Sequence, residues 1–472
     1  MSSMSLLKIE GLTFTYAHSD HPVLKRLNFQ LEPGECAFVF GLNGSGKSTF
    51  ALAAAGVLLK VAKGELDGRI ELNGESVFDL APHKLVQNVG LVVQDPDLQA
   101  ISMTVADEVA YPLKNLGFSD ARAKSRVSEV LELVGLSGYA DLRPDRLSHG
   151  QKQLLALGVA VAARPKLLVL DEPTAYLDPE AEQNFWNVVQ VLKNQGTGVV
   201  IMESWPHVPE FADSVYSLVD GKLIDGIEFR MPNPMAKQGI RLSDLRPVFD
   251  VEALRFSWGD RILLKNANFT VPQGITMLLG ANGSGKTTLT KLLMGILRPQ
   301  EGVVRFDGKP VWELGLSVIG RRVGYLFQNP ERQLICRSVL DEVMLSLRAA
   351  EGGAVSEDRA MELLEYFGIQ ELADRFPLSL SASEKKRAAL ASLLALDPEF
   401  FVLDEPESGL DPLQLANFAN MLERLAEMEK GIFLTTKNFR APSDSQTNAS
   451  AWLQCRLSAN LLELRDGKVI AK

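Results

Sequence analysis

Two glycine-rich segments of this 472-residue chain have the residue types and spacing needed to bind phosphate groups. Residues 41–49 read Gly-Leu-Asn-Gly-Ser-Gly-Lys-Ser-Thr, and residues 280–288 repeat this sequence with two substitutions. In such a segment the glycines expose backbone N–H groups, the lysine reaches the β- and γ-phosphates, and the hydroxyl after it binds Mg²⁺. Each segment follows an apolar run that we expect to be a strand and precedes a predicted helix, over 49–57 and 288–297. This strand–loop–helix order is the one that a phosphate-binding loop requires.

The two segments therefore predict two nucleotide sites in one chain. The residues predicted to bind nucleotide there are Gly41, Asn43, Gly44, Gly46, Lys47, Ser48 and Thr49 in the first segment, and Gly280, Asn282, Gly283, Gly285, Lys286, Thr287 and Thr288 in the second. Within these sets, the hydroxyls of Ser48 and Thr287 are the predicted ligands of Mg²⁺.

A pair of acidic residues ends an apolar run in each half of the chain: Asp171 and Glu172 in the first half, and Asp404 and Glu405 in the second. The aspartate can coordinate Mg²⁺, directly or through water, and the glutamate can polarise an attacking water molecule. The alternative is a strand end with two solvated acids. A phosphate-binding loop upstream at nearly the same spacing in both halves favours the catalytic interpretation. We therefore predict that Glu172 and Glu405 are catalytic and that Asp171 and Asp404 bind metal.

The predicted elements that position these residues occur twice along the chain. Matching motifs lie 233 to 239 residues apart, and a repeat this long indicates two duplicated domains. We predict domains at 1–228 and 248–472, joined by a polar, proline-containing linker at 229–247. Short apolar runs between helical segments predict an α/β fold with a buried, mainly parallel sheet in each domain. Each domain also has a predicted helical insert, at about 96–147 and 330–380.

The bulk composition limits the class of protein. The chain is 46% apolar and 23% charged, which is ordinary for a globular protein, and its formal net charge of −10 makes nucleic acid an unexpected main partner. Its cysteines (Cys36, Cys336 and Cys455) are odd in number and scattered, which favours a reducing cytoplasm over a disulfide framework or a zinc site. We expect no signal peptide and no apolar run of the ~20 residues needed to span a bilayer. If the protein works at a membrane, another subunit must cross it.

Two further segments, Leu147-Ser-His-Gly-Gln151 and Leu380-Ser-Ala-Ser-Glu384, each precede a predicted helix, at 152–163 and 385–396. Combined with the motifs above, they make the chain resemble a fused pair of ATP-binding-cassette (ABC) ATPase domains over nearly its whole length. The resemblance implies two tandem phosphate-loop domains, each with a RecA-like core, a β subdomain and a helical insert, which pair with each other within one chain. It also implies ATP hydrolysis with ATP and Mg²⁺ as ligands.

The resemblance assigns roles to residues outside the phosphate loops. In the family, the segment before the helix (the signature element) closes over the γ-phosphate bound by the opposite domain, a glutamine senses Mg²⁺ and the attacking water, and an aromatic residue stacks on adenine. The matching residues are Ser148, Gly150, Gln151 and Ser381 in the signature elements, Gln94 and Gln328 for the glutamine, and Tyr16 and Trp258 for the aromatic residue. For the two aromatic residues, ordinary core packing is the alternative. Asp178 and Asp411 match the loop that communicates across the dimer.

One family feature is missing. The family usually has a histidine after the strand that follows the communication loop, where it contacts the γ-phosphate, but Ser204 and Lys437 stand at the corresponding positions. We predict Lys437 as a catalytic residue because its charge can contact phosphate, although a solvated surface lysine is the alternative. His207 lies near Ser204 in the wrong register, so it can replace the histidine only if the loop rearranges.

The two signature elements also differ from each other. The first has Gly150, which we expect to allow close approach of its backbone to phosphate, whereas the second has Ser383 and the acidic Glu384. Because sites in this family are composite, the difference predicts two unequal sites. The site built on the second phosphate loop and completed by the first signature element would turn over ATP, and the other site would hold its nucleotide longer.

A narrower resemblance follows each of the two glutamines. Gln94–Gln99 is followed by Thr104–Val109, and Gln328–Gln333 is followed by the similar Ser338–Val343. This pattern is similar to the ATPases of energy-coupling factor (ECF) importers of vitamins and metal ions, where these segments flank a groove for the coupling helices of a transmembrane subunit. The resemblance implies a transmembrane coupling subunit and a substrate-binding membrane subunit as partners, at the cytoplasmic face of the membrane. Generic turn and helix-start chemistry is the alternative.

Three functions are compatible with these features. The first, which we favour, is a transport motor in which ATP binding and hydrolysis drive motion that a membrane subunit uses. The second is a soluble twin ATPase acting on ribosomes or nucleic acid, which the acidic charge and the lack of a long charged helical linker disfavour. The third is a weakly hydrolysing regulatory clamp, against which the presence of both catalytic glutamates argues. The transported substrate is not encoded here, because another polypeptide binds it in such systems.

Overall fold

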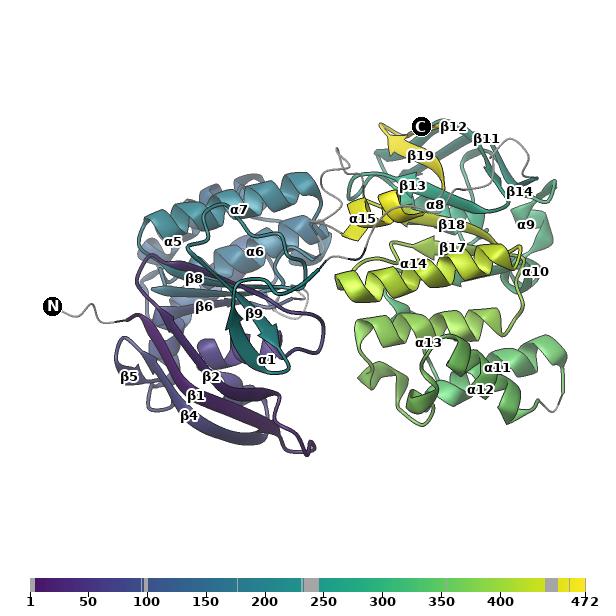
Figure 1. The fold of residues 1–472 in the computed structure, drawn as a ribbon. Coiled ribbons are helices and arrows are strands. Elements are labelled where there is room, and N and C mark those ends of the chain that lie inside the picture. Colours follow the sequence, from purple (N-terminus) through teal and green to yellow (C-terminus); the bar gives the residue numbers. More distant parts are fainter. Residues whose placement is uncertain are drawn as a thin grey trace. The chain divides into compact units, whose positions relative to one another are not determined.

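The computed structural model describes residues 5–94, 96, 101–175, 177–230, 232, 246–353, 355–437, 449–457 and 459–471. The chain divides into two compact units, Met1–Arg230 and Met231–Lys472, here called unit 1 and unit 2 (Figure 1). The division falls inside the predicted linker, most of which lies outside the described residues. The predicted domain bounds therefore stay a prediction.

Unit 1 contains two sheets. Its four-stranded antiparallel sheet has the order β2-β1-β4-β5. The strands are β1 (Leu7–Tyr16), β2 (Leu24–Leu31), β4 (Gly64–Leu72) and β5 (Glu75–Ser76). This sheet is the β subdomain expected from the resemblance, and it carries Tyr16 at the last residue of β1.

The second sheet of unit 1 has six strands in the order β10-β9-β3-β8-β7-β6. They are β3 (Cys36–Phe40), β6 (Val89–Val92), β7 (Leu167–Asp171), β8 (Gly198–Glu203), β9 (Ser214–Val219) and β10 (Lys222–Asp225). All neighbouring pairs are parallel except β9 with β10 at the edge, and every residue of β3, β7 and β8 is buried. The buried, mainly parallel sheet predicted from the apolar runs is therefore confirmed, because helices cover both faces of such a sheet.

The helices of unit 1 follow the strand-to-helix alternation predicted from the sequence. They are α1 (Lys47–Ala54), α2 (Leu58–Val61), α3 (Pro82–Asn88), α4 (Val105–Asn115), α5 (Asp120–Leu133), α6 (His149–Val161) and α7 (Pro179–Asn194). The predicted helix at 49–57 was wrong at both ends. Helix α1 starts at Lys47 because Gly46, with φ of 104°, ends the loop, and the chain leaves the helix before Gly56, with φ of 70°.

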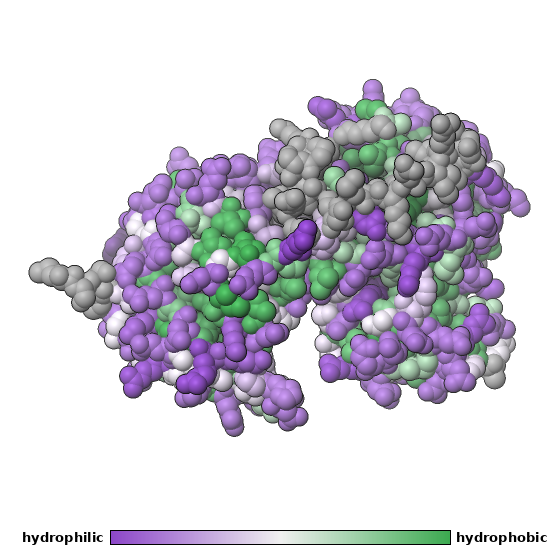
Figure 2. All heavy atoms as spheres, in the orientation of Figure 1, coloured by the Kyte–Doolittle hydropathy of each residue, from purple (hydrophilic) through white to green (hydrophobic). Residues whose placement is uncertain are grey.

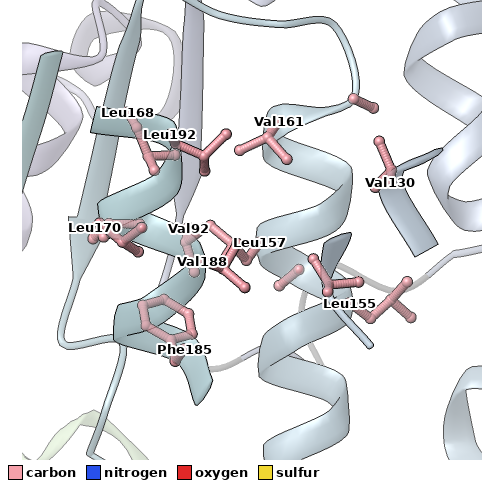
Figure 3. Close-up of a cluster of buried hydrophobic side chains, with 14 of the residues drawn as sticks. Val92, Val130, Leu155, Leu157, Val161, Leu168, Leu170, Phe185, Val188 and Leu192 are labelled. Atoms are coloured by element: carbon pink, nitrogen blue, oxygen red, sulfur yellow. The ribbon is translucent and has the colours of Figure 1, made fainter. Parts of the chain in front are cut away.

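Helix α6, which follows the first signature element, packs on two sides (Figure 3). Its apolar side chains share one buried cluster with the sheet, with α7 and with α5 of the helical insert. The labelled members are Leu155, Leu157 and Val161 of α6, Val92, Leu168 and Leu170 of the sheet, Phe185, Val188 and Leu192 of α7, and Val130 of α5. Dense packing on both sides means that α6 cannot shift without moving its neighbours.

Unit 2 repeats this architecture, with sheets in the orders β12-β11-β14-β15 and β16-β17-β18-β13-β19-β20. The strands are β11 (Pro247–Trp258), β12 (Arg261–Pro272), β13 (Ile275–Leu279), β14 (Glu301–Phe306), β15 (Lys309–Pro310), β16 (Val323–Leu326), β17 (Phe400–Asp404), β18 (Gly431–Thr436), β19 (Asn460–Arg465) and β20 (Lys468–Ala471). The larger sheet is again parallel except for β19 with β20.

The helices of unit 2 correspond to those of unit 1 with three differences: residues 294–300 form no helix at the place of α2, and α9 and α15 are additional. They are α8 (Lys286–Leu293), α9 (Val311–Leu314), α10 (Leu316–Arg322), α11 (Val339–Glu351), α12 (Glu357–Tyr366), α13 (Ala382–Leu394), α14 (Pro412–Glu427) and α15 (Ala449–Arg456). Helix α8 also starts two residues before its predicted position. Helix α15 is added between β18 and β19, where residues 204–213 of unit 1 form no helix.

Hydrophilic side chains cover much of the surface visible in Figure 2, with hydrophobic areas between them. Among the described residues, no helix combines the length and the apolar character needed to cross a membrane.

Candidate nucleotide sites

The phosphate loop of unit 1 holds its lysine in a buried position between backbone and carboxylate. Lys47 Nζ donates hydrogen bonds to the carbonyl oxygens of Gly41 (2.7 Å) and Leu42 (3.1 Å). It also forms an ion pair with Glu172 Oε1 at 3.0 Å, and both side chains are buried. The loop and the predicted catalytic glutamate are therefore joined through one ammonium group.

Unit 2 builds the same contacts. Lys286 Nζ donates to the carbonyl oxygens of Gly280 (2.8 Å) and Ala281 (3.0 Å), and it pairs with Glu405 Oε1 at 3.0 Å. The two sites thus agree closely around the phosphate-loop lysine, as their sequences predict.

Each predicted catalytic glutamate is held by a second contact and by a strained backbone. Gln94 Nε2 donates to Glu172 Oε2 at 2.9 Å, and Gln328 Nε2 donates to Glu405 Oε2 at 3.0 Å. The φ angles of Glu172 and Glu405 are 47° and 44°, in the left-handed region that is costly for residues other than glycine. Such a conformation persists only where the surroundings fix it, so each carboxylate has a defined position.

The aspartate before each glutamate ends a strand and is buried. Burial raises the pKa of the Asp171 carboxyl to about 6, although hydrogen bonding with Ser48 lowers it, and burial raises the pKa of Asp404 to about 6 against a hydrogen bond with Thr287. Within the part of the chain that the structure describes, Asp171 Oδ1 is buried without a hydrogen-bond partner. A carboxylate oxygen in this state fits a cation ligand, because a cation would offset the cost of burying its charge.

Glycine is required at two kinds of position in the loops. Gly46 and Gly285 have φ angles of 104° and 108°, which only glycine adopts readily. Gly41 has no room for a side chain, because a Cβ there would lie 2.5 Å from Ser45 Oγ. Both effects keep the backbone N–H groups of the loop near the site.

The two aromatic residues predicted to stack on adenine lie at the surface. The Tyr16 side chain is 37% exposed, and its hydroxyl lies 2.9 Å from Thr49 Oγ1 at the start of α1. The Trp258 side chain is 56% exposed, and its Nε1 donates to Thr288 Oγ1 at 3.4 Å. Both residues therefore lie beside a phosphate loop and are exposed to solvent, which argues against ordinary core packing, although each ring also contacts a phenylalanine edge-on.

Both signature elements form capping boxes at the start of their helices. In unit 1, Ser148 N donates to Gln151 Oε1 (2.9 Å) and Gln151 N donates to Ser148 Oγ (3.3 Å). In unit 2, the backbone N–H and the hydroxyl of Ser381 both donate to Glu384 Oε2 at 2.8 Å. The acid that distinguishes the second element therefore accepts a hydrogen bond from the hydroxyl of its own serine.

The glycine of the first signature element lies close to the next helix. A Cβ on Gly150 would lie 3.2 Å from Cβ of Ala181 and 3.6 Å from Cδ2 of Leu177. The missing side chain thus makes room for the packing of α6 against α7. The expected close approach of the Gly150 backbone to phosphate stays a prediction. The counterpart of Gly150, Ser383, is also buried.

The residues at the missing-histidine positions are buried in both units. Ser204 follows β8, and Lys437 follows β18. Burial raises the pKa of the Glu405 carboxyl, but Lys286 and then Lys437 lower it, and the net result is a lowered pKa. Lys437 therefore lies near the Glu405 carboxylate and is not a solvated surface lysine. His207 is half exposed, with Nδ1 3.5 Å from Glu182 Oε1 on α7.

The communication-loop aspartates serve as helix caps. The Asp178 side chain accepts from Ala181 N (3.0 Å) at the start of α7, and the Asp411 side chain accepts from Gln414 N (2.7 Å) at the start of α14. The caps fix where each loop ends.

The segments that carry the narrower resemblance are described only in part. Residues 95 and 97–100 of the first pattern lie outside the described residues. In the described part, buried Glu108 accepts from the backbone N–H groups of Ile101 (3.0 Å) and Ser102 (2.6 Å), and Glu342 accepts from those of Ile335 and Cys336. The glutamate of the Val-x-Asp-Glu-Val pattern therefore anchors the loop before its own helix.

A buried carboxylate–hydroxyl pair beside each catalytic glutamate was not predicted from the sequence. Glu203 accepts from Thr174 in unit 1, and Glu407 accepts from Thr436 in unit 2. Thr174 and Glu407 occupy corresponding positions, as do Glu203 and Thr436, because β7 pairs with β8 and β17 with β18 in the same register. Alignment of the two halves offered a signal, since the same two positions hold a glutamate and a threonine in reversed order.

Two copies of a phosphate-loop α/β fold, each with a buried lysine–glutamate–glutamine arrangement, define the class of protein: a nucleotide hydrolase with two sites. The ABC transporter family model matches residues 24–175 and 264–408. The chain therefore belongs to the ABC transporter family, as an ATP-binding subunit with two tandem ATPase domains.

Relatives along most of the chain agree with this assignment. A Bacillus subtilis (strain 168) protein provisionally named an HMP/thiamine import ATP-binding protein, YkoD, is 28% identical over 93% of this chain and 88% of its own length. A Methanosarcina acetivorans protein provisionally named an ABC transporter ATP-binding protein is 30% identical over 93% of this chain and 83% of its own. A chain in a model of ribosome-bound archaeal Pelota and ABCE1 matches 98% of this chain and 78% of its own length with a TM-score of 0.65 at 20% identity, which shows the fold alone.

Proposed function

We propose that this ATPase is the energy-coupling subunit of an ECF-type importer, and that it drives uptake of a vitamin or metal ion through separate membrane subunits. The observation that carries the proposal is a matching pair of loops before α4 and α11. Ile101 and Ile335, 65% and 76% exposed, project from loops that Glu108 and Glu342 anchor through backbone N–H groups. Anchored, exposed apolar side chains fit a surface that a partner covers. The import function in the name of the Bacillus relative supports the same proposal.

The proposed roles at each site follow from the contacts. ATP phosphates compete with the glutamate for the phosphate-loop lysine, so binding frees a carboxylate oxygen of Glu172 or Glu405 to accept a proton from the attacking water. Gln94 and Gln328 keep that carboxylate oriented while the lysine turns to phosphate. Mg²⁺ would neutralise phosphate charge, held by Ser48, Gln94 and Asp171 in unit 1 and by Thr287, Gln328 and Asp404 in unit 2.

Unequal hydrolysis remains part of the proposal. The Ser381 hydroxyl is engaged by Glu384, which also adds negative charge to that signature element. The Ser148 element has the neutral Gln151 in the same place. A neutral element is the better ligand for a γ-phosphate, which favours turnover at the site that Ser148 completes.

The membrane partners would be a transmembrane coupling subunit and a substrate-binding subunit, with this chain at the cytoplasmic face. The test is co-purification of membrane proteins from detergent-solubilised membranes, followed by mass spectrometry. We expect two membrane proteins to be recovered, and Ile101→Asp combined with Ile335→Asp to reduce their recovery by about tenfold or more. Ile470→Asp, on exposed β20, is the matched control and should leave recovery unchanged. Recovery of ribosomal proteins without membrane proteins would overturn the importer proposal.

A further inference from the structure

Next to the proposed catalytic glutamate, each unit has a hydrogen-bonded pair of a glutamate and a threonine. The two residues exchange positions between the units. In unit 1 the carboxylate is on the strand end: Glu203 Oε1 accepts from Thr174 Oγ1 at 2.7 Å and from Thr174 N at 3.2 Å. In unit 2 the carboxylate is on the loop: Glu407 Oε1 accepts from Thr436 Oγ1 at 2.5 Å and from Ser450 Oγ of α15 at 2.8 Å. Each pair links the loop after the catalytic glutamate to the neighbouring strand.

The reversal is accompanied by a change on the helix after the signature element. Lys386 of α13 is buried, and its Nζ donates to the carbonyl oxygen of Pro406 at 2.6 Å and to that of Ser408. These two carbonyl groups belong to the residues on either side of Glu407. At the corresponding position of α6, unit 1 has the buried, neutral Gln153.

We propose that Lys386 is a positioning residue that ties the signature helix of unit 2 to the loop carrying Glu405, through two backbone carbonyls and the charge of Glu407. In the described part of unit 1, Gln153 Nε2 and Oε1 are buried without a hydrogen-bond partner, so Gln153 does not form the corresponding link. A displacement of the second signature element would therefore be transmitted through Lys386 to the loop of Glu405. The position of Glu405 would then depend on the position of helix α13 in the same unit. This inference rests on the proposed ATPase roles of the two glutamates.

The geometry explains why the tie would affect catalysis as well as stability. Pro406 follows Glu405 in the chain, and Glu405 holds a left-handed φ of 44° that its surroundings must maintain. Loss of the hydrogen bond to the Pro406 carbonyl would let the peptide between Pro406 and Glu407 rotate, one residue after Glu405. A displacement of about 1 Å at a catalytic group can cost roughly 100-fold in rate.

The charged groups around Lys386 give the tie a pH dependence. Burial lowers the pKa of the Lys386 ammonium group to about 8, against the attraction of Glu407 and Glu405 and together with repulsion from Lys437. Above this pH the ammonium group loses its charge, and the hold on the loop weakens. An arginine in its place would stay charged across the same range.

The test measures ATP turnover of the full chain with Glu172→Gln as background, so that unit 2 is read alone. Lys386→Gln, which installs the unit 1 residue, should lower kcat by about 10- to 100-fold and change KM by less than about threefold, because the loop and not the phosphate site is disturbed. Lys386→Arg should keep most of the turnover and move the alkaline loss of kcat to higher pH. Hydrogen exchange of residues 405–411 should rise in Lys386→Gln and return in Lys386→Arg.

Lys386→Arg is also the control for simple misfolding, because it keeps the buried charge and a donor to the loop carbonyls. It should keep kcat within about threefold of the parent. Turnover unchanged in Lys386→Gln, or Lys386→Arg as slow as Lys386→Gln, would overturn the inference. Normal turnover in a Glu405→Gln chain would also overturn the inference, because Glu405 would then not be the catalytic residue that Lys386 positions. That result would still be compatible with the proposed ATPase function. Absence of ATPase activity from the unmodified chain would instead overturn the proposed function.

Discussion

Glu203 should make the stability of unit 1 depend on pH at neutral and mildly alkaline values, where most carboxyl groups no longer change their protonation. Burial raises the pKa of its carboxyl from the ordinary 4.5 to about 8, the negative charge of Glu172 raises it further, and the hydrogen bond from Thr174 lowers it. An unfolded glutamate loses its proton near pH 4.5, whereas folded Glu203 keeps its proton until about pH 8. Folding therefore takes up a proton between these values, and the free energy of unfolding falls as the pH rises through them.

The size of the effect follows from the two pKa values. Each pH unit between them reduces the free energy of unfolding by about 1.4 kcal/mol, so the total loss between pH 4.5 and pH 8 is at most about 5 kcal/mol. The Glu203→Gln variant keeps an oxygen that can accept the hydrogen bond from Thr174, but its side chain cannot ionise. We expect the variant to match the parent near pH 5 and to be more stable than the parent by several kcal/mol at pH 8.5.

The assay is a urea titration of the full chain without added nucleotide. Unfolding is monitored by hydrogen exchange with mass spectrometry. Peptides from β7 and β8 report on unit 1, and those from β17 and β18 are an internal control, because Thr436 stands where unit 1 has Glu203. Glu180→Gln, the same chemical change at an exposed residue, is the matched variant. If Glu203→Gln and the parent differ by the same amount at pH 5.5 and 8.5, Glu203 is not protonated in the folded protein and the reasoning fails.

Two further predictions concern the nucleotide sites. Glu405→Gln should slow ATP turnover by about 10²–10⁴-fold and Glu172→Gln by less, as measured by single-turnover hydrolysis; a larger effect of Glu172→Gln would reverse the assignment of the faster site. Trp258→Ala and Tyr16→Ala should each weaken ATP binding by about 1–3 kcal/mol while phenylalanine at either position keeps most of the affinity, as measured by calorimetry. Affinity unchanged in both alanine variants would show that neither ring stacks on the base.

The phosphate loops illustrate how far local sequence carries. The strand before each loop and the acids at the end of β7 and β17 could be predicted directly, because each depends on neighbours within a few residues. The role of the loop residues as phosphate ligands stays a prediction. The starts of α1 and α8 were misjudged by two residues, since the left-handed φ of Gly46 and Gly285 lets the helix begin at the lysine itself. The packing role of Gly150 could not be foreseen, because the atom that would crowd a side chain there belongs to Ala181, on the next helix.

The sequence by itself determined the duplication, the phosphate-binding chemistry of each half, the acids that end the central strands, and the absence of a histidine from both sites. Only the tertiary structure decided how Glu172 meets Lys47 and Gln94, and that a threonine and a glutamate exchange places between the two units. These contacts join residues on different strands and loops, and the order and register of the parallel sheet bring them together. Local sequence patterns determine which segments become strands. Which strands become neighbours depends on burying both faces of the sheet, which involves residues far apart in the chain.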